Sequence, residues 1–289
     1  MEDKKIEGNE EWSLVVKPTS GWFDLHLSDV WRYRDLIMLF VRRDFVSVYK
    51  QTILGPAWFV IQPILTTIMF MVVFGGIAKI PTDGIPGALF YLSGLTVWNY
   101  FATCFNKTSS TFLANAAIFG KVYFPRLAAP VSSIISSMIS LMIQFLLFIL
   151  VFIYFILFKS ISFHFNMYML LIPYLIVIMG GLGLGFGIII SSLTTKYRDL
   201  TYLVGFGVQL IMYATPVVYP LSLVKDTKFR MVVLANPMSS IVETFRYAFF
   251  PKGEFHWLYL AYSSIFMLII LFFGVLLFNR TEKNFMDTV

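Results

Sequence analysis

The stretch LAAPVSSIISSMISLMIQFLLFILVFIYFILF, residues 127–158, decides the fold of this chain. It contains no charged residue, and it is bounded by Arg126 and Lys159. A helix needs about 20 predominantly apolar residues to cross the hydrocarbon core of a bilayer. The stretch therefore predicts a membrane-spanning helix.

The rest of the composition extends this prediction to the whole chain. Of its 289 residues, 58% are hydrophobic and only 13% are charged. Soluble domains carry about 45–50% apolar and about 25% charged residues. A soluble enzyme is thereby excluded, and an all-α integral membrane protein is expected. Uncharged runs predict six spans, at about 58–78, 87–105, 127–157, 168–193, 200–224 and 257–278.

Lysine and arginine predict the orientation of these spans. With the N-terminus inside, 15 of the 22 cations fall in cytoplasmic segments and 7 fall outside. Cytoplasmic loops carry the excess of cations in membrane proteins. Both termini are therefore expected in the cytoplasm, as a polar extension (1–27) and a short tail (281–289), with a transmembrane domain over 57–280 between them. The last outer segment is the exception, since it holds five cations.

Residues 28–56 precede the first span and begin with an amphipathic segment. Over 28–50, apolar residues recur at helical spacing, while cations that include Arg42, Arg43 and Lys50 lie mostly on the other side. This pattern predicts a helix in the inner membrane interface. A simple extension of the first span is the alternative.

Two further segments between spans predict short helices. Residues 106–120 are mildly amphipathic and lie in a predicted cytoplasmic loop, where they could face another protein or form the frayed end of the second span. Residues 235–250 begin with Asn236-Pro237, a helix start signal, and are too short to span. They predict a re-entrant or interfacial helix on the outer side, or an ordinary surface helix, with Glu243 and Arg246 as an i,i+3 pair.

Several kinds of chemistry have no signature in the sequence. There is no GxxxxGK[ST] phosphate loop, no HExxH and no GxSxG, and Cys104 is the sole cysteine. The cores of the predicted spans hold no Asp, Glu, Lys or Arg, whereas proton- and ion-driven carriers usually hold such residues there. The energy for any transport is thus expected from another chain. The glycines of 180–187, GGLGLGFG, predict close helix packing, with a hinge as the alternative.

Aromatic residues are numerous, at 31 Phe, 15 Tyr and 6 Trp. Many lie near span ends, which is typical of an interfacial aromatic belt. Alternatively, some could line a conduit and stack on sugar faces. The candidates for a conduit are Phe90, Tyr91, Trp98, Tyr213 and Tyr219.

The segment YKQTILGPAWFVIQP, residues 49–63, resembles the start of the first span in ABC-transporter permeases that export polysaccharides, especially O-antigen. Four more segments match that family in order over residues 28–280: Arg42-Arg43-Asp44, GKVYFP at 120–125 with Arg126, Tyr197-Arg198-Asp199, and Asn236-Pro237.

The resemblance implies a homodimer in the bacterial inner membrane. Each subunit would pair with a separate cytoplasmic ATPase, which binds the ATP and Mg, while this chain binds no cofactor or metal and is no enzyme. The dimer would move a lipid-linked glycan, typically on undecaprenyl diphosphate. The implied ATPase-coupling residues are Asn115, Ile118, Phe119 and Lys121, and the outer gate helix would contain Asn236, Pro237, Glu243 and Arg246.

The cations at the inner interface have two interpretations. Arg42, Arg43 and Lys50 could bind the diphosphate headgroup, because guanidinium groups bind phosphate in a bidentate manner. Alternatively, they anchor the helix at the membrane or contact anionic lipids.

Other functions remain as alternatives. Permeases for teichoic acid or capsular polysaccharide share the architecture. A membrane glycosyl- or acyltransferase would need clustered catalytic residues, and the candidates Asp83, Glu243 and Glu254 show no known spacing. A membrane scaffold without transport would not need a coupling helix.

Overall fold

The computed structural model describes residues 27–50, 54–119, 121–122, 124–159, 166–197, 199–224, 228–250 and 252–288. Nearly all of the predicted N-terminal extension lies outside these ranges, as do residues 51–53, Gly120, Tyr123 and Arg198 of the family-like segments. All regular secondary structure of the described residues is helical. The α-helices are α1 (Leu27–Arg32), α2 (Arg34–Tyr49), α3 (Trp58–Phe70), α4 (Gly87–Ser109), α5 (Thr111–Phe119), α6 (Ala128–Lys159), α7 (Ile172–Thr194), α8 (Leu200–Ala214), α9 (Lys228–Ala235), α10 (Pro237–Phe249) and α11 (Trp257–Thr288).

Shorter helical turns join these elements. The 3-10 turns are η1 (Gly55–Ala57), η3 (Met167–Leu171) and η4 (Leu221–Val224), and the π-helical turn η2 (Met71–Ile77) extends α3. The amphipathic segment expected over 28–50 is helical, but it is broken at Tyr33, which separates α1 from α2.

Four helical segments are long and apolar enough to cross a membrane: Trp58–Ile77, Ala128–Lys159, Met167–Thr194 and Trp257–Thr281. They coincide with the predicted first, third, fourth and sixth spans. The other two predicted spans differ. The second predicted span corresponds to α4, which is 23 residues long but less apolar than these four. Other helices surround α4, so it does not need an apolar surface toward lipid.

The predicted fifth span, 200–224, is not one continuous helix. α8 ends at Ala214 after 15 residues, which is about 22 Å of helix and too short to cross the hydrocarbon core alone. The sequence TPVVYP that follows explains the end, because Pro216 and Pro220 cannot donate a backbone hydrogen bond. The chain continues through an irregular segment to η4.

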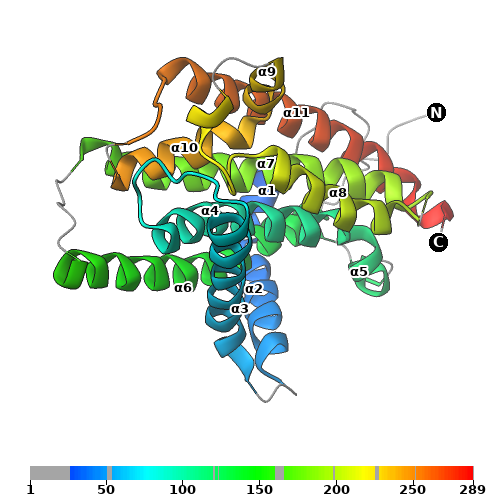
Figure 1. Ribbon diagram of the computed structural model, residues 1–289. Coiled ribbons are helices and arrows are strands. Elements are labelled where there is room, and N and C mark those ends of the chain that lie inside the picture. The colour runs from blue at the N-terminus through cyan, green and yellow to red at the C-terminus, as the bar shows by residue number, and fades with distance from the viewer. Residues whose placement is uncertain are drawn as a thin grey trace, which may run out of the picture.

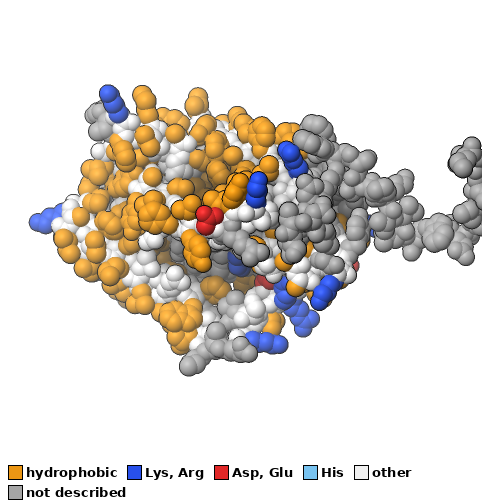
Figure 2. Space-filling model, turned by 90° about the vertical axis from the view of Figure 1, so that its right-hand side faces the viewer, with side chains coloured by type: hydrophobic (Ala, Val, Ile, Leu, Met, Phe, Trp, Pro, Cys, Tyr) orange, Lys and Arg blue, Asp and Glu red, His pale blue; other side chains and the backbone are white. Residues whose placement is uncertain are grey.

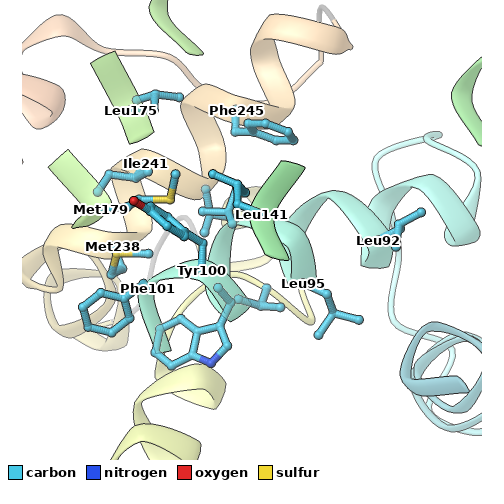
Figure 3. Packing of buried hydrophobic residues seen from close by; sticks show 14 of the residues in the cluster. Leu92, Leu95, Tyr100, Phe101, Leu141, Leu175, Met179, Met238, Ile241 and Phe245 are labelled. Carbon is cyan, nitrogen blue, oxygen red and sulfur yellow. The ribbon is translucent and has the colours of Figure 1, made fainter. Parts of the chain in front are cut away.

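The main core lies where α4 packs between α7, α6 and α10. Figure 3 shows Tyr100 and Phe101 of α4 close to Met179 of α7 and to residues of α10. In Figure 1, α6, α7 and α11 run in similar directions, while α2 and α3 extend across them from one side. Only 17% of the most apolar window of Trp58–Ile77, which is α3 with η2, is buried in the chain, so this segment is largely left for lipid or another subunit.

Glycines bring α7 close to both of its neighbours. A Cβ on Gly183 would lie 2.6 Å from Cβ of Cys104 in α4, and one on Gly185 would lie 2.7 Å from a side-chain carbon of Ile270 in α11. Real Cβ atoms do not approach this closely. The prediction that the glycine cluster serves helix packing is thus confirmed, and α7 is held between α4 and α11.

The outer surface of the molecule is apolar over wide areas. Large hydrophobic side chains are exposed along α3, α6, α8 and α11. Figure 2 shows one face on which hydrophobic side chains predominate. Exposed patches of this extent are unusual for a soluble monomer and are typical of surfaces that face lipid or a partner.

Candidate functional site at the inner and outer ends

The end of the molecule that the sequence predicts on the cytoplasmic side is here called the inner end, and the opposite one the outer end. The inner end is built around a cluster of phenylalanines separate from the main core. Phe112 of α5 stacks on Phe278 of α11 with ring centroids 4.5 Å apart. Phe119 of α5 and Phe40 of α2 both pack against Phe124 in the loop before α6. The backbone N–H of Phe112 also donates to Oγ of Ser191 in α7. The short helix α5 is therefore fixed to α2, α7 and α11 on its buried side.

Two of the four predicted coupling residues lie on this buried side. Phe119 is 3% exposed and Asn115 is 8% exposed, so neither is available to a partner in this conformation. Ile118 is half-buried and Lys121 is exposed. The open side of α5 instead presents Leu113, Ala114 and Ala117, which the sequence analysis did not single out.

Arg43 connects α2 to α5. Its guanidinium donates to Oδ1 of Asn115 at 3.3 Å and to Oδ1 of Asp44 at 2.9 Å, and it lies over the ring of Phe40 at 4.8 Å. The Asn115 amide in turn donates to the carbonyl of Thr111. The structure thus brings together one predicted headgroup residue and one predicted coupling residue.

The other two predicted headgroup residues are placed differently. Arg42 and Lys50 are exposed. Among the described residues, the side chain of Arg42 makes no hydrogen bond or ion pair. An exposed, unengaged cation is available to an anionic group, whereas Arg43 already has partners within the chain.

Three of the five aromatic conduit candidates lie inside the subunit. Phe90, Tyr91 and Trp98 of α4 are at most 3% exposed, so they cannot line an open passage in this conformation. Burial of α4 on all sides, which uncharged runs do not reveal, explains the difference. Tyr213 near the end of α8 is 44% exposed, and Tyr219 is half-buried with its hydroxyl donating to the carbonyl of Ala214.

At the outer end, α10 begins as the sequence predicts. Oδ1 of Asn236 accepts from the backbone N–H of Met238, and Pro237 occupies the first helical position. The helix is not a surface helix, however, because all of its residues except Ser240 and Tyr247 are buried. Glu243 and Arg246 do form the expected ion pair, at 3.3 Å, and both are buried.

The neighbouring helix α9 is much more exposed. Among its residues only Val233 is buried. Its attachment includes an ion pair from Arg230 to Glu254 at 2.6 Å, whose hydrogen bond raises the pKa of the Arg230 guanidinium. The hydroxyl of Tyr262 also donates to the carbonyl of Ala235, at the end of α9. The two short outer helices thus differ, since α10 is part of the core and α9 lies on its surface.

Within the described ranges, no group of three or more His, Cys, Asp or Glu side chains could hold a metal ion. Most buried serine and threonine hydroxyls donate within their own helix, and a few tie helices together, as Thr108 does by donating to the carbonyl of Gly183 at 3.0 Å. The described residues therefore fit a bundle of packed helices better than a catalytic centre.

Comparison with known proteins agrees with this arrangement. The family model described as "ABC-2 type transporter" matches residues 35–250. A protein named O-antigen export system permease protein RfbA from Klebsiella pneumoniae is 26% identical over 253 residues, which cover 88% of this chain and 94% of the relative. A protein of the same name from Myxococcus xanthus is 25% identical over 77% of this chain and 83% of its own length. The matched region runs from α2 through α10 and so includes both ends of the site, and the chain belongs to the ABC-2 type transporter family.

Proposed function

We propose that this chain is the permease subunit of an ABC exporter. Its cargo would be a lipid-linked polysaccharide, with O-antigen on undecaprenyl diphosphate as the first candidate, moved across the bacterial inner membrane. The observation that supports this most is the match to relatives named as O-antigen export permeases over nearly their whole length. Capsular polysaccharide and teichoic acid are the alternative cargoes.

We further propose six membrane crossings with both termini in the cytoplasm. The four long apolar segments supply four of them. α4 would supply another, as a span shielded from lipid by its neighbours, and α8 would supply the last together with the segment that leads to η4. The segment 28–56 would lie at the inner interface, ahead of a transmembrane domain over 57–280 and a tail over 281–289.

The energy would come from a separate ATPase that binds ATP and Mg. We propose that it docks on the open side of α5, around Ala117 and Lys121, and that two permeases and two ATPases form the complex. The apolar surface left uncovered on α3 supports a second copy of the chain as the partner there.

The experiment that tests this proposal is purification of the chain from its native membranes in mild detergent, followed by identification of stoichiometric partners by mass spectrometry. A P-loop ATPase at one copy per permease is the expected result. Absence of any ATPase, under conditions that preserve other ABC complexes, would contradict the proposal. A carbohydrate-binding domain on the ATPase would favour a capped O-antigen over teichoic acid.

The two neighbouring arginines of α2 are expected to have different roles. Arg42→Gln should lower glycan export about tenfold and leave the ATPase rate unchanged, because only a contact with an anionic headgroup is lost. Arg43→Gln should instead weaken the stimulation of the ATPase by the permease, because the tie to Asn115 is lost. Export and ATP hydrolysis measured in the same vesicles separate the two effects. Identical losses of export and ATPase stimulation in both variants would contradict this division of roles.

At the outer end, we propose that α9 covers the exit while α10 forms its fixed wall. This modifies the gate expected around Asn236, Pro237, Glu243 and Arg246, since those residues belong to the buried helix. Tyr213 is the conduit candidate that the arrangement favours, because it is exposed near the outer end of α8.

A further inference from the structure

Arg246 is a buried cation whose contacts reach beyond its partner Glu243. Its side chain is 2% exposed, and its guanidinium lies 3.7 Å from the ring centre of Phe90 in α4. Burial of a charge is costly unless the charge is paired and hydrogen-bonded. Glu243 supplies the opposite charge, one turn away on α10, and the ring face of Phe90 adds a favourable cation–π contact.

Both terminal nitrogens of Arg246 also bind the backbone just beyond the outer end of α8, while its Nε has no partner among the described residues. Nη1 donates to the carbonyl of Pro216, and Nη2 donates to the carbonyl of Val217 at 2.7 Å. The helix has already ended at Ala214, and the prolines nearby provide no N–H groups to bond these carbonyls. Buried carbonyls need a donor, and Arg246 provides it from another helix.

α4 leaves room for this contact at Gly94. A Cβ on Gly94 would lie 2.7 Å from Nη2 of Arg246 and 3.0 Å from the carbonyl oxygen of Val217. Any larger residue would therefore displace the guanidinium or the segment that it binds. A glycine within a helix often marks such a close approach.

A second tie joins the same two elements. The side-chain amide of Asn236, which caps α10, donates to Oγ1 of Thr215 at 2.7 Å. Segment 215–217, just after α8, is thus held by α10 at two points and by α4 through contact with Gly94.

We infer that Arg246 is a positioning residue that fixes the outer end of α8 to α4 and α10, so that these three elements move as one block. Under the proposed export function, on which this role in transport rests, the block is the wall of the exit. α8 could then move outward only after the carbonyls of Pro216 and Val217, which follow it, separate from Arg246. α9 could move separately because it is mostly exposed.

Hydrogen exchange measured by mass spectrometry tests this inference on the full permease in lipid nanodiscs. In Arg246→Met, peptides covering 211–224 should exchange about tenfold faster than in the parent, because the free carbonyls no longer hold the segment. Gly94→Ala retains both charges but crowds the guanidinium, and it should accelerate exchange in the same peptides. Lys252→Gln is the matched control, since it removes a cation bound to the nearby turn at Gly84 and should leave 211–224 unchanged.

A second variant distinguishes a local effect from destabilisation of the whole protein. Arg246→Met alone leaves the carboxylate of Glu243 buried without its partner, which can destabilise the whole protein. Arg246→Met with Glu243→Gln removes both charges, keeps an acceptor for the backbone N–H of Leu221, which bonds Glu243, and still leaves the two carbonyls without their donor. Local acceleration in this double variant supports the inference. Unchanged exchange over 211–224, or equal acceleration throughout α4 and α7, would overturn it.

This measurement needs neither glycan nor ATPase. Loss of the export function in other tests would therefore leave the exchange result interpretable. Conversely, an exchange result that contradicts the inference would exclude this role of Arg246. It would not affect the proposed permease function.

Discussion

Replacement of Gly187 by valine is expected to abolish the accumulation of folded protein. A Cβ at this position would overlap Oγ1 of Thr108 in α4 and would approach the backbone nitrogen of Ser109 to 3.1 Å. The helices would have to separate along the contact that forms the centre of the core. Overpacking typically costs about 1–3 kcal/mol, and here main chain as well as side chain must move, so the upper end of that range applies.

The measurement is size-exclusion chromatography of the solubilised protein, with the fraction in the folded peak compared between variants. Gly207→Val in α8 is the matched control, because nothing lies within 4 Å of the Cβ that it would add. The same exchange in another apolar helix should therefore leave the folded peak nearly unchanged. Comparable losses in both variants would mean that the contact between α4 and α7 does not set the stability of the fold.

Replacement of Ala117 by glutamate is expected to remove the ATPase from the complex while the permease stays folded. Ala117 is exposed on α5, whose opposite side is fixed by Phe112 and Phe119 in the inner cluster. A carboxylate placed in a docked apolar surface would be buried without a partner, which is strongly unfavourable. The ATPase recovered per permease should fall more than about tenfold, which corresponds to about 1.4 kcal/mol.

Ala235→Glu provides the control, because Ala235 is also an exposed alanine at the surface of a short helix, but on α9 at the proposed outer side. It should retain the ATPase fully. Retention of the ATPase by Ala117→Glu as well would show that docking does not involve the open side of α5, although the permease function could still hold.

The sequence was sufficient to predict most of the helices but not their surroundings, and α9 was not among those predicted. Runs without charge located the four long apolar segments to within a few residues, because exclusion of charge is itself a requirement of the membrane. Local chemistry also predicted the start of α10 at Asn236 and Pro237, since capping depends on near neighbours in the chain. The end of α8 lies within the predicted fifth span, because hydropathy continues beyond Ala214 whereas Pro216 and Pro220 break the backbone hydrogen-bond pattern.

The site residues whose surroundings were predicted wrongly are those that the structure buries. Asn115 and Phe119 belong to the helix expected to face a partner, yet they point into the chain because α2 and the loop before α6 cover that side. Likewise, the sequence of a single helix cannot show that an i,i+3 pair such as Glu243 and Arg246 is buried. Only contacts with segments far away in the sequence, at Phe90 and Val217, make it a buried pair.

The length of α6 has a consequence for the membrane around the protein. A straight helix of 32 residues is about 48 Å long, against about 30 Å of hydrocarbon. Even at a tilt of about 40°, the upper end of the usual range, only about 26 residues fit inside that layer. At least about six residues of α6 therefore lie beyond the hydrocarbon, among the lipid headgroups. Hydrophobic mismatch would thus set this helix obliquely, with Lys159 anchored among the headgroups at one surface.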